Sequence, residues 1–147
     1  MNDKINLDRF IDAQETDYET ALSEIKNGRK ESHWMWYIFP QLQGLGVSAT
    51  SKLYAIHDMQ EAEAFLRHNV LGERLIRICN ELVKINSNDA LQIFGSPDHL
   101  KLKSSMTLFS CLNMHPVFDL VLDKFFRGRK DDRTLSIIER QNKIGRE

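Results

Sequence analysis

The aromatic side chains of this chain are concentrated in one short stretch that has polar groups at both ends. Both tryptophans, Trp34 and Trp36, belong to a block of four aromatic rings within positions 34–39. Bulky rings with polar groups around them are typical of a ligand pocket, and also of a core, because aromatic residues bury a large apolar area. We therefore expect this block to form a pocket wall or a core nucleus. The polar residues at its edges are Arg29, Lys30, His33, Gln41, Gln43 and Ser48.

His33 stands immediately before the aromatic block and is a candidate for proton transfer, because imidazole titrates near neutral pH. The alternative is a histidine that bonds to the backbone at the start of a helix. Cys111 and His115 are four positions apart, but a zinc site needs a second pair of ligands. The other histidines, which show no metal-ligand spacing, are His57, His68 and His99. We therefore predict no metal and no cofactor.

A second polar stretch, residues 96–107, begins with a Ser-Pro pair that is typical of a helix start. The free N–H groups of a helix N-terminus, with lysines and hydroxyls nearby, suit a phosphate or a carboxylate. The alternative is a solvated surface helix. However, three hydroxyl residues stand among apolar ones and disfavour a helix interior, which indicates a polar face that is buried or lines a cleft. The candidates in this stretch are Asp98, Lys101, Lys103, Ser104, Ser105 and Thr107.

Residues 44–49 match the glycine-rich dinucleotide fingerprint, with alanine in the third place. That fingerprint has meaning only between a strand and a helix of a parallel sheet, and no strand pattern surrounds it here. The glycines instead predict a loop whose backbone closely approaches another part of the protein or a ligand. Neither a Gly-x-Ser-x-Gly elbow nor a cysteine in a polar setting is present, so covalent catalysis is not expected.

The composition is that of an ordinary globular protein: 147 residues, 41% hydrophobic, 28% charged and a net charge of −1. We expect one domain over residues 1–147. A nearly neutral surface has no field to attract nucleic acid, so nucleic acid is not the expected partner and any anion site must be local. The N-terminus lacks the pattern of a secretory signal, and no apolar run has the length of a membrane span, so a cytoplasmic protein without a membrane partner is predicted. Cys79 and Cys111 lie in apolar helical patterns and are predicted to be buried free thiols.

The long segments all have the helical period, which predicts a compact all-α orthogonal bundle of about seven helices with short connections. Residues 33–39 fit a short helix that stops at Pro40, or a buried strand, and we favour the helix. Residues 41–51 are predicted to be a loop. Helices are predicted over 7–25, 33–39, 58–68, 70–85, 90–94, 96–112, 117–126 and 134–141.

These motifs resemble those of the bacterial proteins grouped as domain of unknown function 1810. The matching stretches are 28–30, 33–36, 39–41, 44–48, 68–75, 94–109 and 128–134. The resemblance implies a mainly helical fold and no established activity. Some members carry a calpastatin-like label, but inhibitor segments of that kind are flexible, whereas this composition is globular. Because the motifs are polar and aromatic rather than interchangeably apolar, the resemblance implies a cleft shared by 33–41 and 98–107.

We therefore expect a small-molecule-binding helical protein or enzyme with a pocket for a phosphate- or ribose-bearing, anionic metabolite. His33 or Asp98 would carry any proton transfer. The alternative is a non-enzymatic module that contacts a protein or nucleic acid through the 44–48 loop and the basic loops. The residues expected to hold the ligand are Lys30, Trp34, Trp36, Gln41, Ser48, Lys101, Lys103, Ser104, Ser105 and Thr107.

Overall fold

The computed structural model describes residues 5–146, and this part of the chain is all-α, as predicted. It holds nine helices and no strand, apart from one isolated bridge pair between Leu42 and Ile56. The helices are α1 (Asp8–Lys26), α2 (Met35–Ile38), α3 (Ala49–Leu53), α4 (Met59–Arg67), α5 (Leu71–Lys84), α6 (Ala90–Phe94), α7 (Asp98–Ser110), α8 (Val117–Phe126) and α9 (Asp132–Arg146).

Several helix ends follow their local sequence signals. The Asp58 side chain caps α4 by accepting a hydrogen bond of 2.9 Å from the Glu61 N–H. Gly95, with φ +77°, ends α6 in a conformation that other residues seldom adopt. Helix α8 has the predicted limits, and Gly128 follows it at positive φ.

The described residues form nine helices where about seven were predicted, and the largest differences from the predicted limits lie at α3 and α9. Helix α3 lies partly inside the predicted 41–51 loop, where the Ser48 hydroxyl caps it by accepting from the Ser51 N–H at 3.1 Å. A helix of five residues is too short to show a hydrophobic period. Helix α9 extends to Arg146 rather than ending near 141, because residues 132–144 contain no glycine or proline that would end it.

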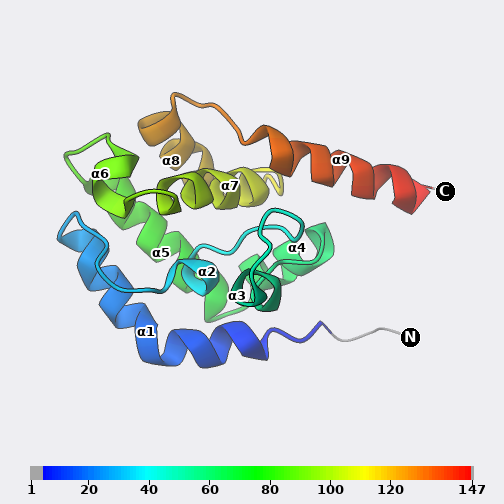
Figure 1. Cartoon of the computed structure of the whole chain (residues 1–147), viewed down its shortest axis with the longest axis horizontal. Helices are drawn as coiled ribbons and strands as arrows, with labels where there is room; N and C mark the ends of the chain where they lie inside the picture. Colours follow the sequence, from blue (N-terminus) through cyan, green and yellow to red (C-terminus); the bar gives the residue numbers. More distant parts are fainter. Residues whose placement is uncertain (1–4, 147) are drawn as a thin grey trace.

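Helix α5 lies at the centre of the molecule, where it packs against α1, α4 and α8. Helix α7 crosses above it and contacts α4, α6, α8 and α9. Figure 1 shows α1 along one side of the molecule and α9 along the other, with the short α2 and α3 between them. The largest fully buried side chains that fill the centre are Trp34, Phe10, Phe39, Phe65, Phe109 and Phe118. Within residues 5–146, no helix combines the length and the apolar character that a membrane crossing requires.

Candidate functional site: a cavity beside an aromatic and charged cluster

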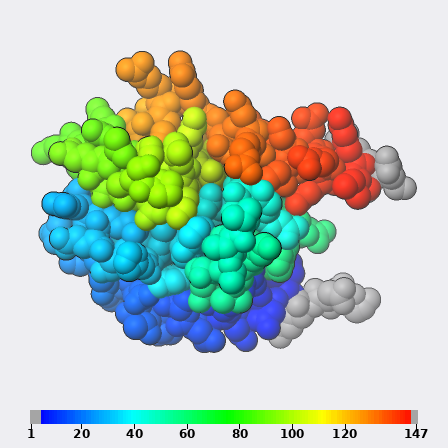
Figure 2. All heavy atoms as spheres, in the orientation of Figure 1, coloured from blue at the N-terminus to red at the C-terminus, as the bar shows by residue number. Residues whose placement is uncertain are grey.

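A cavity of about 810 Å³ lies between the 41–46 loop, α3 and α9. In Figure 2 the surface of residues 41–55, in cyan to teal, meets the orange-red surface of α9. Two aromatic rings, three cationic side chains and several uncharged polar groups line the cavity. The lining residues are Trp36, Gln41, Leu42, Gln43, Gly44, Leu45, Gly46, Ser51, Lys52, Tyr54, Ala55, Asp132, Arg133, Ser136, Ile137, Arg140, Gln141 and Ile144.

The two glycines of the 44–46 loop let it fit between α3 and α9. Gly44 has φ +96°, and a Cβ on it would lie 3.3 Å from the Ile137 methyl group. A Cβ on Gly46 would lie 2.6 Å from the Ser51 side chain, which is closer than carbon atoms can approach. The predicted close approach of this loop is therefore to protein. The dinucleotide fingerprint lacks its structural context, because no strand precedes it within the described residues.

Helix α9 is held to the rest of the molecule by polar contacts at both ends of the cavity. The Thr107 hydroxyl of α7 accepts from the Asp131 N–H at 2.8 Å, and the Asp131 carboxylate then caps α9 through Thr134. Arg133 donates to the Gly44 carbonyl at 3.4 Å, and the Gln141 amide donates to the His57 carbonyl at 3.0 Å. These contacts set the position of the α9 face that lines the cavity.

A cluster of charged and aromatic side chains adjoins the cavity at Trp36. The Asp98 carboxylate accepts from Lys30 and from Lys101, each at 2.9 Å. The Lys101 ammonium lies 3.7 Å above the Trp36 ring centroid, and the Lys30 ammonium lies 5.1 Å from the Trp34 ring. Burial raises the pKa of Asp98, but the hydrogen bonds and charges of the two lysines outweigh it, so the pKa falls and the carboxylate stays ionised.

The Glu24 carboxylate fixes the chain that leads into the aromatic block. It accepts from the Glu31 N–H at 2.7 Å, from the Ser32 N–H and hydroxyl at 2.9 and 2.6 Å, and from the Trp34 indole at 2.9 Å. Burial alone would raise the pKa of Glu24. The hydrogen bonds to its ionised form have the larger effect, and the pKa falls from 4.5 to about 2. Trp34 is thereby held in the core, fully buried.

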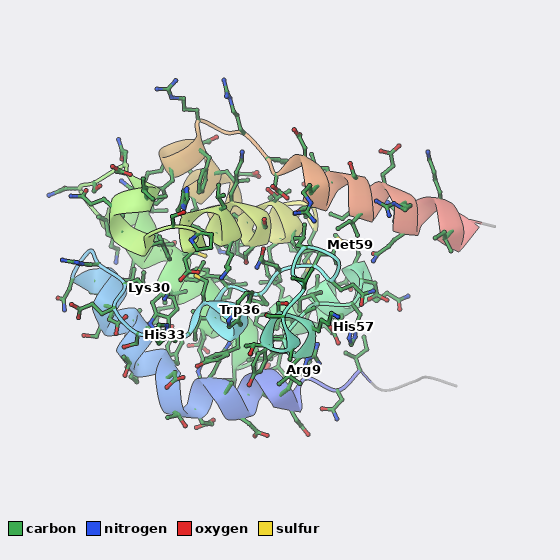
Figure 3. All side chains as sticks on the ribbon, viewed as in Figure 1. Arg9, Lys30, His33, Trp36, His57 and Met59 are labelled. Carbon is green, nitrogen blue, oxygen red and sulfur yellow. The ribbon has the colours of Figure 1, made fainter. Side chains whose placement is uncertain are left out.

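The structure brings one group of the predicted residues together. Lys30, Asp98 and Lys101 meet over the two tryptophan rings, and Trp36 with Gln41 lines the cavity. Figure 3 shows Lys30 and His33 near the turn after α1, with Trp36 toward the middle of the molecule and Arg9 and His57 at its other side. The stretches 33–41 and 98–107, which were expected to share a cleft, meet where Lys101 packs on Trp36, and no described residue of 98–107 lines the cavity.

Other predicted residues lie elsewhere. His33 is exposed, Lys103 is half-buried, and Ser48 caps α3. The hydroxyls of Ser104 and Thr107 donate to the carbonyls of Leu100 and Lys103, one turn earlier in α7. Ser105 is fully buried and, within the described structure, its hydroxyl has no hydrogen-bond partner. The hydroxyls of α7 are thus buried by neighbouring helices rather than placed in the cavity.

Of the two interpretations of the aromatic block, a pocket wall or a core nucleus, the core applies to most of its rings. Trp34, Tyr37 and Phe39 are buried, whereas Trp36 is half-buried and reaches the cavity. Trp34 and Trp36 are two positions apart, which places them on opposite sides of a helical turn.

Sequence reasoning missed the contributions of α3 and α9 to the cavity. The α9 lining residues recur at steps of three and four positions, which is the signature of one helix face. The sequence shows this spacing, but it does not show that the α9 face lies opposite the 41–46 loop and α3. The missed residues of α3, its C-terminal end and α9 that carry polar or aromatic groups are Ser51, Lys52, Tyr54, Asp132, Arg133, Ser136, Arg140 and Gln141.

Metal binding has no support in the described part of the chain, where no group of three or more histidine, cysteine or carboxylate side chains is close enough to hold an ion. Both cysteines are free thiols. Cys79 is buried and Cys111 is half-buried, so the prediction of two buried thiols holds fully for Cys79 alone.

Fold and site together define an all-α protein with a cavity that is bordered by cationic side chains and by Trp36, whose ring lies under the Lys101 ammonium. The family model described as "Protein of unknown function (DUF1810)" matches residues 4–138, and the chain belongs to this family. The crystal structure of the conserved hypothetical protein Rv1873 from Mycobacterium tuberculosis is similar to it, with 40% sequence identity and a TM-score of 0.91. That similarity covers 93% of this chain and 99% of Rv1873. A search of curated proteins finds no match.

Proposed function

We propose that this protein binds a small anionic molecule, of the phosphate- or ribose-bearing class, in the cavity between the 41–46 loop, α3 and α9. The observation that carries the proposal is the cavity itself, whose volume of about 810 Å³ suits a small metabolite. Its lining combines the rings of Trp36 and Tyr54 with amide and hydroxyl groups that can orient a sugar.

The charge of the lining favours an anion. The cavity lining has three cationic side chains, those of Lys52, Arg133 and Arg140, and only one carboxylate, that of Asp132. The net charge of the whole protein is −1. The cavity is therefore a local concentration of positive charge. Arginine is well suited to phosphate because its planar guanidinium donates two parallel hydrogen bonds.

Binding rather than catalysis is the role we propose for this cavity. An Asp98 carboxylate that is kept ionised between two ammonium groups is better suited to hold those cations than to exchange a proton. Proton transfer by His33 or Asp98 stays a prediction from the sequence.

A thermal-shift screen of the pure protein against nucleotides, sugar phosphates and small dicarboxylates tests the proposal. A ligand at about 100 times its Kd stabilises the fold by roughly 2.7 kcal/mol, which raises the Tm by about 5–10 °C in a chain of this size. We expect such a shift in the wild type and its loss in the double variant R133Q/R140Q.

The matched control is Lys143→Gln, because Lys143 is an exposed cation of α9 that does not line the cavity. A shift that survives in R133Q/R140Q would place the ligand elsewhere. Absence of any shift across the screen would contradict the proposal.

Exposed apolar side chains near the cavity favour a second candidate, a protein segment as the occupant. Val47 and Leu53 are 91% and 56% exposed, and Ile144, which lines the cavity, is 68% exposed. This candidate predicts a blank small-molecule screen and a partner that is retained by the wild type but lost with L53S/I144S.

A further inference from the structure

We propose that Asp98 and Lys101 are positioning residues that hold the Trp36 indole as the recognition wall of the cavity, and that the ligand carries an electron-rich flat ring such as a nucleobase. This inference rests on the proposed function, because it names the ring-binding end of the same cavity.

The Trp36 ring is fixed from the side of α7. The Lys101 ammonium lies 3.7 Å from the ring centroid and donates to the Asp98 carboxylate at 2.9 Å. Lys30 holds the other oxygen of that carboxylate, also at 2.9 Å. The side chains of Lys30, Asp98 and Lys101 are only 7%, 19% and 19% exposed, so solvent screens these contacts weakly.

Trp36 borders both the cavity and the Lys101 ammonium. Trp36 lines the cavity, whereas Lys101 is not among the described residues that do so. Lys101 therefore acts on the ligand through Trp36 and does not touch it. This changes the direct ligand-binding role that the sequence predicted for Lys101.

A cation over an aromatic ring is attracted by the negative charge of the ring face and pulls electron density toward itself. The remaining surface of the Trp36 indole thus favours an electron-rich ring and disfavours a second cation. Tyr54 supplies another fixed aromatic group, since its ring packs edge-on against Tyr37 with centroids 5.0 Å apart. The cavity therefore presents two held rings together with the cations of α3 and α9, and this combination suits a nucleoside phosphate.

Fluorine NMR of protein labelled with 5-fluorotryptophan tests the positioning without any ligand. The chain has two tryptophans, and Trp36→Phe identifies the Trp36 signal. We expect K101M and D98N to shift or broaden that signal. The control K26M makes the same lysine-to-methionine change at an exposed position of α1 and is expected to leave it in place. A Trp36 signal unchanged in both K101M and D98N would overturn the proposal.

Calorimetric titration with adenosine 5′-monophosphate and ribose 5-phosphate tests the ring selectivity. The wild type is expected to prefer the nucleotide, and K101M to reduce that preference by about three- to tenfold while binding ribose 5-phosphate as before. K101R keeps a cation at the ring and is expected to restore the preference, which also separates the effect from a loss of folding.

The possible failures are distinguishable. Binding of ribose 5-phosphate without a preference for the nucleotide, or a preference unchanged in K101M, overturns this inference and leaves the proposed function standing. Binding of neither probe to the wild type overturns both.

Discussion

Glu24 shows at the scale of one residue how a buried charge can be stabilising. Glu24 is 8% exposed, and its carboxylate accepts four hydrogen bonds from the segment that enters the aromatic block. Hydrogen bonds to an ionised group are stronger than neutral ones, and an unpaired buried donor is costly. The residue therefore ties the end of α1 to Trp34.

We predict that Glu24→Gln lowers the free energy of unfolding by about 2–3 kcal/mol at pH 7, because an amide cannot accept all four donors. The exposed Glu19→Gln, also in α1, is the matched control and should change little. Equilibrium unfolding in urea measures both. Equal stability of the two variants would show that the hydrogen bonds of Glu24 contribute nothing net.

The pH dependence of this effect follows from the lowered pKa. Because the pKa of Glu24 falls from 4.5 to about 2 on folding, its stabilisation is fully present above pH 4.5 and is lost as the pH falls toward 2. The difference in unfolding free energy between wild type and Glu24→Gln should therefore shrink between pH 5 and pH 2. A difference that stays constant over that range would contradict the assigned pKa.

At the scale of elements, the close packing of α4 and α5 depends on Gly72. The Gly72 N–H donates to the His68 carbonyl at 3.0 Å in the turn between the two helices. A Cβ at this position would collide with the backbone carbonyl of Leu66, at the end of α4. Backbone cannot move aside as a flexible side chain can, so the two helices would have to separate.

We predict that Gly72→Ala lowers the unfolding free energy by about 1–3 kcal/mol, although alanine is the better helix former. Glu73→Ala, at the exposed next position, is the control and should be neutral or slightly stabilising. Thermal denaturation followed by circular dichroism measures both. A stabilised Gly72→Ala would mean that α4 and α5 have room to adjust.

At the scale of the whole molecule, one continuous core joins α1, α5, α7 and α8 around Cys79. The Cys79 sulfur lies 3.7 Å from that of Met106, is fully buried, and its burial raises the pKa of the thiol above its ordinary value. The thiolate is the reactive form of cysteine. Cys79 is therefore protected from reagents because it is inaccessible to solvent and because its thiol stays protonated.

We predict that Ellman's reagent labels one thiol quickly in the native protein, the half-buried Cys111, and that Cys79 reacts only as the whole core opens. Cys79→Ala should remove the slow phase alone, and Cys111→Ala the fast phase alone. The rate of the slow phase should match the unfolding rate extrapolated from denaturant. A fast reaction of Cys79 would show that the core opens locally.

The sequence by itself determined the class of fold and many of the helix limits. The helical period, the Asp58 cap, the glycine after α6 and the limits of α8 are local features, and each depends on residues a few positions apart. The unusual motifs of 33–41 and 98–107 contain Trp36, Asp98 and Lys101, which the folded chain brings into contact.

Only the tertiary structure decided which side chains face the cavity. Trp34 and Trp36 look alike in the sequence, but the bond to Glu24 directs the first into the core and leaves the second beside α9. The α9 face with Arg133 and Arg140 meets the 41–46 loop, where Arg133 donates to the carbonyl of Gly44, 89 positions earlier in the chain. Contacts at such separation are set by the packing of the whole molecule, and no local pattern records them.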